Sequence, residues 1–238
     1  MEPSSGTSPS TQPRVKRGDA PKQALRRHNY RERSLPCLRR DFQDRCAYSM
    51  QHMLRAGGES CMEVDHFNPA HKDKPTQSYS NLYLATRHCN LAKRRKWPNS
   101  KEKRAGCRFL DCCSEMDYGV HLFEDSGTHE LVGVTPAGRW HIIMCDLNAP
   151  HFTDERRRRA AAREFFEETP ATFYGAALPS EVAELADAYE EQYRLMIPYI
   201  PPPPETPKEL TACPSGTSKA ERGPQQPVRT ATVPSSGR

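Results

Sequence analysis

Residues 62–98, MEVDHFNPAHKDKPTQSYSNLYLATRHCNLAKRRKWP, decide the fold of this chain. They contain two short apolar segments, 63–67 and 81–85, separated by a polar stretch. The first segment is expected to be a strand that ends before Pro69, because proline lacks the N–H that a strand ladder needs and restricts the residue before it. The second is followed by residues 87–96, which suit a short helix. The predicted local order is therefore strand, loop, strand, helix.

A helix is expected to lead into this region. Leu38, Phe42 and Cys46 recur at a spacing of four residues. This spacing predicts a short helix within residues 34–48, with all three side chains on one face.

Further elements are predicted after the basic stretch. Residues 131–135 and 139–145 flank Pro136-Ala137-Gly138, a pattern that predicts a β-hairpin. Thr153 is a suitable N-cap for a helix over 154–168, because acidic residues follow it in the first turn. Another helix is predicted from Ser180 to about Ile197, with an apolar stripe of Val182, Leu185, Tyr189 and Met196.

Basic residues are concentrated next to the predicted strands. The stretch 87–108 holds nine lysines or arginines and one acid, Glu102, although the net charge of the whole chain is only +5. A second basic region covers residues 14–45, whereas 180–197 is acidic. By itself the basic stretch is more simply a solvated face, but its position beside candidate catalytic residues favours contact with phosphate.

The candidate catalytic residues are those that phosphodiester hydrolysis requires. This reaction needs a base to activate water and a cation to neutralise the developing charge. His66 suits the first role, and the oxygens of Asp65, Asn81 and Asn90 are hard ligands suited to the second. Neighbours on a strand point to opposite faces unless the strand bends, and Asn68-Pro69 could supply that bend. Taken singly, each residue has an ordinary interpretation as a surface, turn or cap residue; the combination is rarer.

This combination resembles the HNH endonuclease family. RCAYSM at 45–50 and the motif at 62–98 match the subgroup with a Cys-x-Tyr-Cys knuckle, Asp-His-Phe-x-Pro, Tyr-x-Asn-Leu, and Cys-x-x-Cys-Asn-x-x-Lys before Trp-Pro. The resemblance covers 53 residues, near a quarter of the chain. It implies a ββα-metal fold, which agrees with the order derived above. The residues at 132–159 also look like the extension that often follows such domains.

The resemblance implies a role for each matched position. Asp65 matches the metal ligand, and His66 matches the general base that takes a proton from the attacking water. Asn81 matches the middle asparagine, which orients the histidine's loop, and Asn90 matches a second metal ligand. One Mg²⁺ or Mn²⁺ ion is the implied cofactor. The residues expected to contact phosphate are Arg87, Lys93, Arg94, Arg95 and Lys96.

The zinc knuckle of the family is incomplete in this sequence. Cys46 and Cys89 are kept, but Ser49 and Thr86 stand at the other two places. Structural zinc sites are closed sets of four nitrogen or sulfur ligands, so we expect the zinc to be lost and packing to replace it. The alternative is that nearby residues, Cys61 or His88, take part. Cys107 with Cys112-Cys113 suggests another metal cluster, but buried thiols are the interpretation we favour there.

Composition sets the domain boundaries. The ends are rich in Ser, Pro, Gly, Thr and charge, and mean hydropathy is −0.86. We expect an α+β protein in which an HNH nuclease core at 34–110 is followed by a hairpin and helical extension at 111–200. Residues 1–33 are expected to be a disordered basic tail and 201–238 a disordered Pro-rich tail. With no membrane span, no secretory signal and nine scattered cysteines, the protein is expected in the cytoplasm without a disulfide framework.

Three functional hypotheses remain open from the sequence. The first is a metal-dependent endonuclease that acts on DNA with salt-sensitive binding. The second keeps the fold without the chemistry, as a catalytically inactive nucleic-acid-binding module. The third is a partner-regulated effector nuclease of a bacterial defence or restriction system, which would dock a protein partner through the acidic helix at 180–197.

Overall fold

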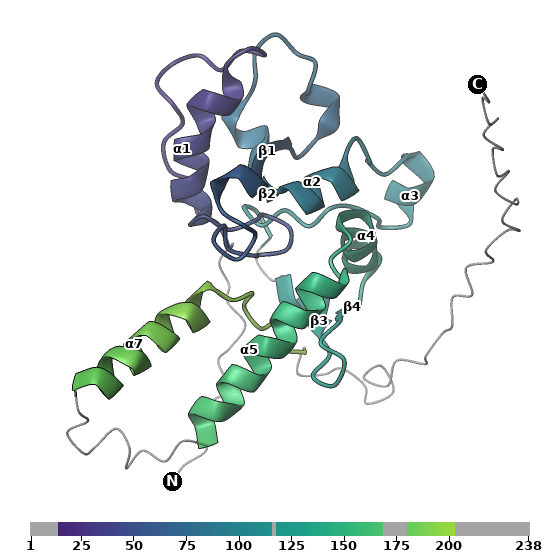
Figure 1. The fold of residues 1–238 in the computed structure, drawn as a ribbon. Helices are drawn as coiled ribbons and strands as arrows, with labels where there is room; N and C mark the ends of the chain where they lie inside the picture. The colour runs from purple at the N-terminus through teal and green to yellow at the C-terminus, as the bar shows by residue number, and fades with distance from the viewer. Residues whose placement is uncertain (1–13, 116–117, 169–179, 203–238) are drawn as a thin grey trace, which may run out of the picture. The chain divides into compact units, whose positions relative to one another are not determined.

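Two antiparallel strands and the helix that follows them form the region of the predicted site (Figure 1). The computed structural model describes residues 14–115, 118–168 and 180–202. For 165–168 and 180–186 it describes the backbone but not the side chains. Strand β1 (Met62–His66) pairs with β2 (Leu82–Thr86), and the register places Asp65 opposite Tyr83. Helix α2 (Arg87–Lys93) follows directly, because Thr86 caps it by accepting a hydrogen bond from the backbone of Cys89. The predicted order of strand, loop, strand and helix is confirmed.

Helices α1 (Tyr30–Phe42) and α2 both contact the two strands β1 and β2. All five residues of β2 are buried, as expected for a strand covered on both faces. The helix predicted at 34–48 exists but begins four residues earlier and ends at Phe42, because Gln43 adopts a left-handed conformation with φ of 52°. Leu38 and Phe42 are buried on the helix, and Cys46 is buried beyond its end.

The expectation of a disordered tail over residues 1–33 is wrong for residues 14–33. Val15 and Leu25 are buried, and the backbone N–H of Val15 donates to the carbonyl of Cys112 at 3.0 Å. Backbone hydrogen bonds also join Gln77 to Leu25 and Arg27 to Pro75. Tertiary contacts therefore order a segment whose composition is polar. Residues 1–13 lie outside the described part of the chain, as do 203–238 of the predicted Pro-rich tail.

The hairpin predicted around Pro136-Ala137-Gly138 is also wrong. Strand β4 (Leu131–Gly133) pairs with β3 (Leu122–Glu124), and residues that were expected to form the second strand lie in helix α4 (Pro136–Cys145). Thr135 caps this helix by accepting from the N–H of Gly138, and proline suits a first helical position, where its missing N–H is not needed. The absence of a side chain at Gly138 lets it approach the carbonyl of His121.

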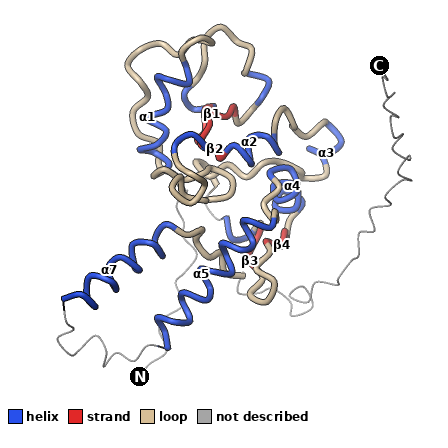
Figure 2. The backbone as a smooth tube through the Cα atoms, viewed as in Figure 1, coloured by secondary structure: helices blue, strands red, loops and turns tan. Residues whose placement is uncertain are grey.

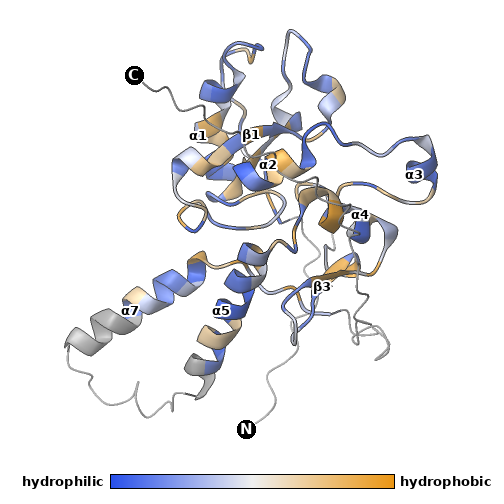
Figure 3. Cartoon of the chain, turned by 45° about the vertical axis from the view of Figure 1, so that its right-hand side comes forward, coloured by the Kyte–Doolittle hydropathy of each residue, from blue (hydrophilic) through white to orange (hydrophobic). Residues whose placement is uncertain are grey.

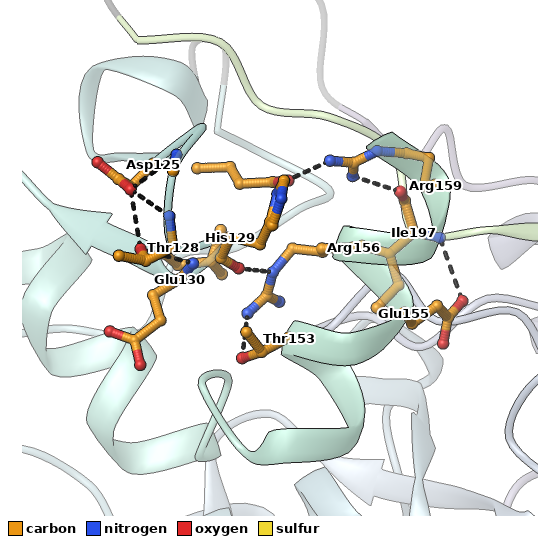
Figure 4. A network of polar contacts seen from close by, with 12 residues as sticks. Asp125, Thr128, His129, Glu130, Thr153, Glu155, Arg156, Arg159 and Ile197 are labelled. Atoms are coloured by element: carbon orange, nitrogen blue, oxygen red, sulfur yellow. Dashed lines mark hydrogen bonds and ion pairs between the residues drawn. The ribbon is translucent and has the colours of Figure 1, made fainter. Parts of the chain in front are cut away.

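Helix α5 (Pro150–Glu168) uses buried arginines to hold neighbouring segments (Figure 4). Arg156 donates to the carbonyls of His129 and Leu147, and Arg159 donates to the carbonyl of Ile197. The predicted helix begins at Pro150 instead of after Thr153, again because proline is favoured in the first turn.

The remaining described helices are short or acidic. Helix α3 (Ser100–Arg104) is drawn as hydrophilic in Figure 3 and is closed by a capping box between Asn99 and Glu102. Helix α7 (Ser180–Leu195) confirms the acidic helix but ends two residues before Ile197. The predicted stripe is only partly described there, and its Tyr189 is exposed.

The fold is mixed α+β, with two small antiparallel sheets and more helix than strand (Figure 2). All described residues lie in the compact unit Met1–Glu205, which contains both the expected core and the expected extension. Buried side chains of both regions join one hydrophobic cluster, in which Leu84 and Cys89 pack with Leu122 and Cys145. Within the described residues, no helix combines the length and apolar character of a membrane span.

Candidate functional site

Asp65 lies on β1 as a buried carboxylate with a charged partner. Its Oδ2 accepts a hydrogen bond from the Tyr48 hydroxyl at 2.5 Å and lies 2.8 Å from Lys93 Nζ. Burial, and then the charge of Asp65, raise the pKa of Tyr48, which keeps the phenol a donor. Oδ1 has no hydrogen-bond partner among the described residues. One carboxylate oxygen is therefore neutralised and the other is available.

His66 is buried and held in one tautomer. Its Nε2 lies 2.6 Å from Oε1 of Gln77, whose amide nitrogen donates to the carbonyls of Lys72 and Lys74. Since these two bonds identify the amide nitrogen, Gln77 Oε1 must accept and His66 Nε2 must carry the proton. Nδ1 is then the unprotonated nitrogen. Burial is the largest effect on the pKa of His66 and lowers it, so the neutral imidazole is favoured near pH 7.

Asp65 and His66 face opposite sides of β1. The ring of His66 lies 5.0 Å from the ring of Tyr30 on α1, whereas Asp65 contacts Lys93 on α2. His66 still pairs with Leu82, so β1 does not bend between the two site residues. The bend that could have brought both side chains to one face is absent there.

Asn81 joins the start of β2 to the loop after His66. Its Oδ1 accepts from the backbone N–H of Asn68 at 2.8 Å, and its Nδ2 donates to the carbonyl of Asn68 at 3.1 Å. Its own carbonyl accepts from the N–H of Phe67. Asn81 therefore fixes the two residues that follow His66.

Asn90 does not contact Asp65. Its Nδ2 donates to Glu63, which is two residues before Asp65 on β1 and also pairs with Arg87. Glu63 and Asp65 are two residues apart and therefore lie on the same face of β1. Asn90 contacts Glu63 and Lys93 contacts Asp65, so both α2 side chains approach that face. The amide oxygen of Asn90 has no hydrogen-bond partner among the described residues.

Lys93 is not a phosphate contact. Its side chain is fully buried, and Nζ donates to the backbone carbonyl of His66 at 2.8 Å in addition to pairing with Asp65. This corrects the prediction that placed Lys93 with the phosphate-binding residues. A lysine that bridges two neighbouring site residues positions them both.

The other predicted phosphate contacts are accessible. Arg87, Arg94, Arg95 and Lys96 are all exposed. Arg87 and Arg95 form surface ion pairs with Glu63 and Asp73, which contribute little to stability and can exchange for phosphate. Further along, Lys101, Lys103, Arg104 and Arg108 are exposed too. The basic stretch thus forms a solvent-accessible surface.

The four positions that the resemblance assigns to a zinc knuckle lie around the sulfur of Cys46. Cys46 Sγ accepts from the N–H of Ser49 at 3.5 Å and from the hydroxyl of Thr86 at 3.6 Å. Burial and then a hydrogen bond to Cys46 raise the pKa of Cys89, which makes Cys89 the thiol donor of the pair. Polar contacts therefore connect Ser49, Thr86 and the two cysteines, and the loss of zinc stays a prediction.

His88, one of the two suggested substitute ligands for zinc, has other neighbours. His88 pairs with Asp146 at 3.0 Å, and its ring lies 4.5 Å from that of His151. Within the part of the chain that the structure describes, one group of three metal-ligating side chains brings its ligand atoms within 4.8 Å of one another: Asp111, Cys112 and Cys113.

A cavity of about 470 Å³ lies apart from Asp65 and His66. It is lined by Arg55, Arg87, His88, His151 and Arg158, together with acidic residues of α5. Its lining includes none of the four candidate catalytic residues. The site therefore rests on the β1 and α2 contacts and not on a preformed hollow.

Sequence reasoning missed three residues that contact the site. Gln77 fixes the tautomer of His66, Tyr48 donates to Asp65, and Glu63 binds Asn90. Gln77 lies in a polar loop with no periodic signal. Only Glu63 had one: it is two residues from Asp65 and thus on the same strand face.

Compared with known proteins, the chain matches no family model, no curated protein and no solved structure.

Proposed function

We propose that this protein is an HNH-type, metal-dependent endonuclease that hydrolyses phosphodiester bonds of DNA, with His66 as general base. The observation that carries the proposal is the state of His66. Gln77 holds the proton on Nε2, burial lowers the pKa of the ring, and Nδ1 is left unprotonated. A neutral imidazole with one fixed free nitrogen is what a base needs near neutral pH.

Residues around His66 have separate roles in activating water and in positioning the base. A water at Nδ1 would lose its proton to His66 and attack phosphorus in line with the departing oxygen. Lys93 and Asn81 are positioning residues: Lys93 holds the carbonyl of His66, and Asn81 holds the backbone of Asn68. Neither needs to contact the substrate.

The oxygen donors fit a hard divalent cation. Asp65 Oδ1 and the amide oxygen of Asn90 have no hydrogen-bond partners among the described residues. Mg²⁺ and Mn²⁺ accept such oxygens and keep several waters, so two protein ligands suffice. Asp65 and Asn90, on the face of β1 opposite His66, would hold the ion, and when bound the ion would neutralise negative charge on a phosphate.

The exposed basic surface supports a nucleic-acid substrate. Arg94, Arg95 and Lys96 follow α2 directly and are exposed. Their guanidinium and ammonium groups contact phosphate oxygens without reading sequence. DNA bound along this surface would lie beside the strand that carries His66.

Cleavage of supercoiled plasmid tests the proposal. We expect the purified protein with Mg²⁺ or Mn²⁺ to nick or linearise the plasmid, and EDTA to stop it. His66→Ala should lower the rate by about a hundredfold or more, because a positioned base contributes at least that much. His71→Ala, in the loop after β1, is the matched control and should cut like wild type. Equal cutting by wild type and His66→Ala would refute the assignment.

A second candidate function is a nucleic-acid-binding module without cleavage. The observation in its favour is that Lys93 already neutralises Asp65, while Tyr30 and Gln77 cover His66. Plasmid that stays intact under every metal condition, yet is retarded on a gel, would decide for this function. Docking of a protein partner on α7, whose residues 187–192 are exposed, stays a prediction.

A further inference from the structure

The turn at residues 111–114 carries two adjacent cysteines in an unusual setting. The ligand atoms of Asp111, Cys112 and Cys113 lie within 4.8 Å of one another. Arg17, from the N-terminal segment, donates from Nε to Cys113 Sγ at 3.3 Å. Cys112 is buried, with 1% exposed, whereas Cys113 is half-buried. The pair therefore consists of one half-buried and one buried cysteine.

Arg17 is held firmly beside Cys113. Its guanidinium carbon lies 4.6 to 5.1 Å from the ring centroids of Phe42, Tyr79 and Tyr83, and Nη2 donates to the carbonyl of Leu82 at 2.7 Å. A fixed, partly dehydrated cation stabilises a thiolate. A hydrogen bond from Cys112 is the largest effect on the pKa of Cys113, and with Arg17 it lowers that pKa to about 7 against the opposing effect of burial.

The surroundings favour nucleophilic chemistry over metal binding. Asp111 Oδ1 already accepts from the Tyr83 hydroxyl at 2.6 Å and from the N–H of Cys113 at 2.9 Å. The positive charge of Arg17 also opposes a cation at Cys113. A neutral oxidant needs no free oxygen on Asp111 and is not repelled by the charge of Arg17.

We propose that Cys113 is a peroxide-reactive cysteine and that Cys112 is its resolving partner. The Cys113 thiolate attacks the O–O bond of a hydroperoxide, forming an S–O bond and releasing hydroxide or alkoxide, which takes a proton from water. Cys112 then gives up its proton as its sulfur attacks Cys113, and the hydroxyl group leaves as water. Two electrons pass from the two thiols to the peroxide, and a Cys112–Cys113 disulfide is the product.

The product should be readily reduced. Consecutive Cα atoms are about 3.8 Å apart, which is shorter than the usual span of a disulfide, so a bond between neighbours is strained. Strained and exposed disulfides are the labile ones. The modification is therefore reversible by thiols.

Peptide mapping after hydrogen peroxide treatment tests this inference on the full chain. In wild type we expect the peptide with both cysteines to lose two hydrogens and to recover them with dithiothreitol. Cys112→Ser should instead accumulate a sulfenic acid at Cys113 that dimedone traps. Cys113→Ser should leave Cys112 reduced. Arg17→Gln should slow oxidation about fivefold or more, while Arg17→Lys, which keeps the cation, retains most of the rate.

Cys61 and Cys107 are the internal controls, because both are half-buried and neither has an arginine bonded to its sulfur among the described residues. Oxidation of Cys113 no faster than theirs would overturn the proposal. So would the same product from wild type and Cys112→Ser, or bound zinc that protects both cysteines from alkylation. Circular dichroism of each variant separates a slower reaction from a failure to fold.

Discussion

Lys93 is a buried cation whose partners are both in the candidate site. Because its ammonium neutralises Asp65, removing it leaves a buried carboxylate whose remaining donor among the described residues is the Tyr48 hydroxyl. We predict that Lys93→Met lowers the free energy of unfolding by about 3 to 5 kcal/mol. Urea unfolding at pH 7 measures this.

Arg95→Met is the matched control for Lys93→Met, two residues away. Arg95 is exposed and pairs with Asp73 on the surface, so its loss should change the free energy of unfolding by less than about 0.5 kcal/mol. Similar midpoints for both variants would show that the Asp65–Lys93 pair is not structurally important. Asp65→Asn combined with Lys93→Met should recover part of the loss, because the buried charge is gone.

His141 makes stability depend on pH. It is fully buried, with Nδ1 accepting from the N–H of Leu110 and Nε2 2.8 Å from the Tyr118 hydroxyl. Burial lowers the pKa of His141 to about 3. Between that value and the unfolded pKa near 6.5, the unfolded chain binds one more proton than the folded chain, so stability falls as the pH falls.

We predict that replacing His141 makes the pH dependence shallower. A single such histidine contributes a slope of up to about 1.4 kcal/mol per pH unit. His141→Gln should lose most of that slope in urea unfolding between about pH 4.5 and 6. His28→Gln, at an exposed position, is the control and should keep the slope of wild type. An unchanged slope in His141→Gln would contradict the assignment.

At the scale of elements, α4 shows how a cap and a proline override strand-like residues. The isoleucines of α4 favour a strand by propensity, but Thr135 and Pro136 start a helix, and Gly138 lets it approach the carbonyl of His121 closely. We predict that Thr135→Ala lowers the free energy of unfolding by about 1 kcal/mol, as for other N-cap losses. Thr135→Ser, which keeps the hydroxyl, should restore most of it in the same urea assay. Equal losses in both would mean that the threonine methyl, and not the cap, is responsible.

The loop between β1 and β2 is the other element that matters for the site. Both Asn81 and Gln77 lie in this loop. Asn81 binds the backbone of Asn68, after His66, and Gln77 binds the ring of His66. The N-terminal segment in turn holds the loop through two backbone hydrogen bonds, from Gln77 to the carbonyl of Leu25 and from Arg27 to the carbonyl of Pro75. The environment of the candidate base thus depends on three segments that are distant in sequence.

At the scale of the whole molecule, the proposed binding of DNA should depend mainly on the exposed basic surface. Each phosphate contact releases counterions, so the logarithm of affinity falls with the logarithm of salt by about 0.9 per contact. We predict that replacing Arg94, Arg95 and Lys96 by alanine lowers that slope by about 2 to 3. Fluorescence anisotropy of labelled duplex DNA over a sodium chloride series measures it.

The control variant removes three positive charges from a different exposed segment. Lys22, Arg26 and Arg27 are exposed on the N-terminal segment. Alanine at these three positions should leave the slope nearly unchanged if the surface after α2 makes the contacts. An equal drop for both triple variants would indicate that net charge, and not this surface, drives binding.

The sequence by itself determined the local order around the site. Alternating apolar and polar residues, proline and a basic amphipathic stretch specify β1, β2 and α2 through short-range physics, and the positions of Asp65, His66, Asn81 and Asn90 follow from that order. Only the tertiary structure decided what those residues contact. Gln77, Tyr48 and the N-terminal segment reach the site from distant positions, and Lys93 is buried because α2 packs against β1. Such contacts depend on packing between segments, which no local pattern encodes.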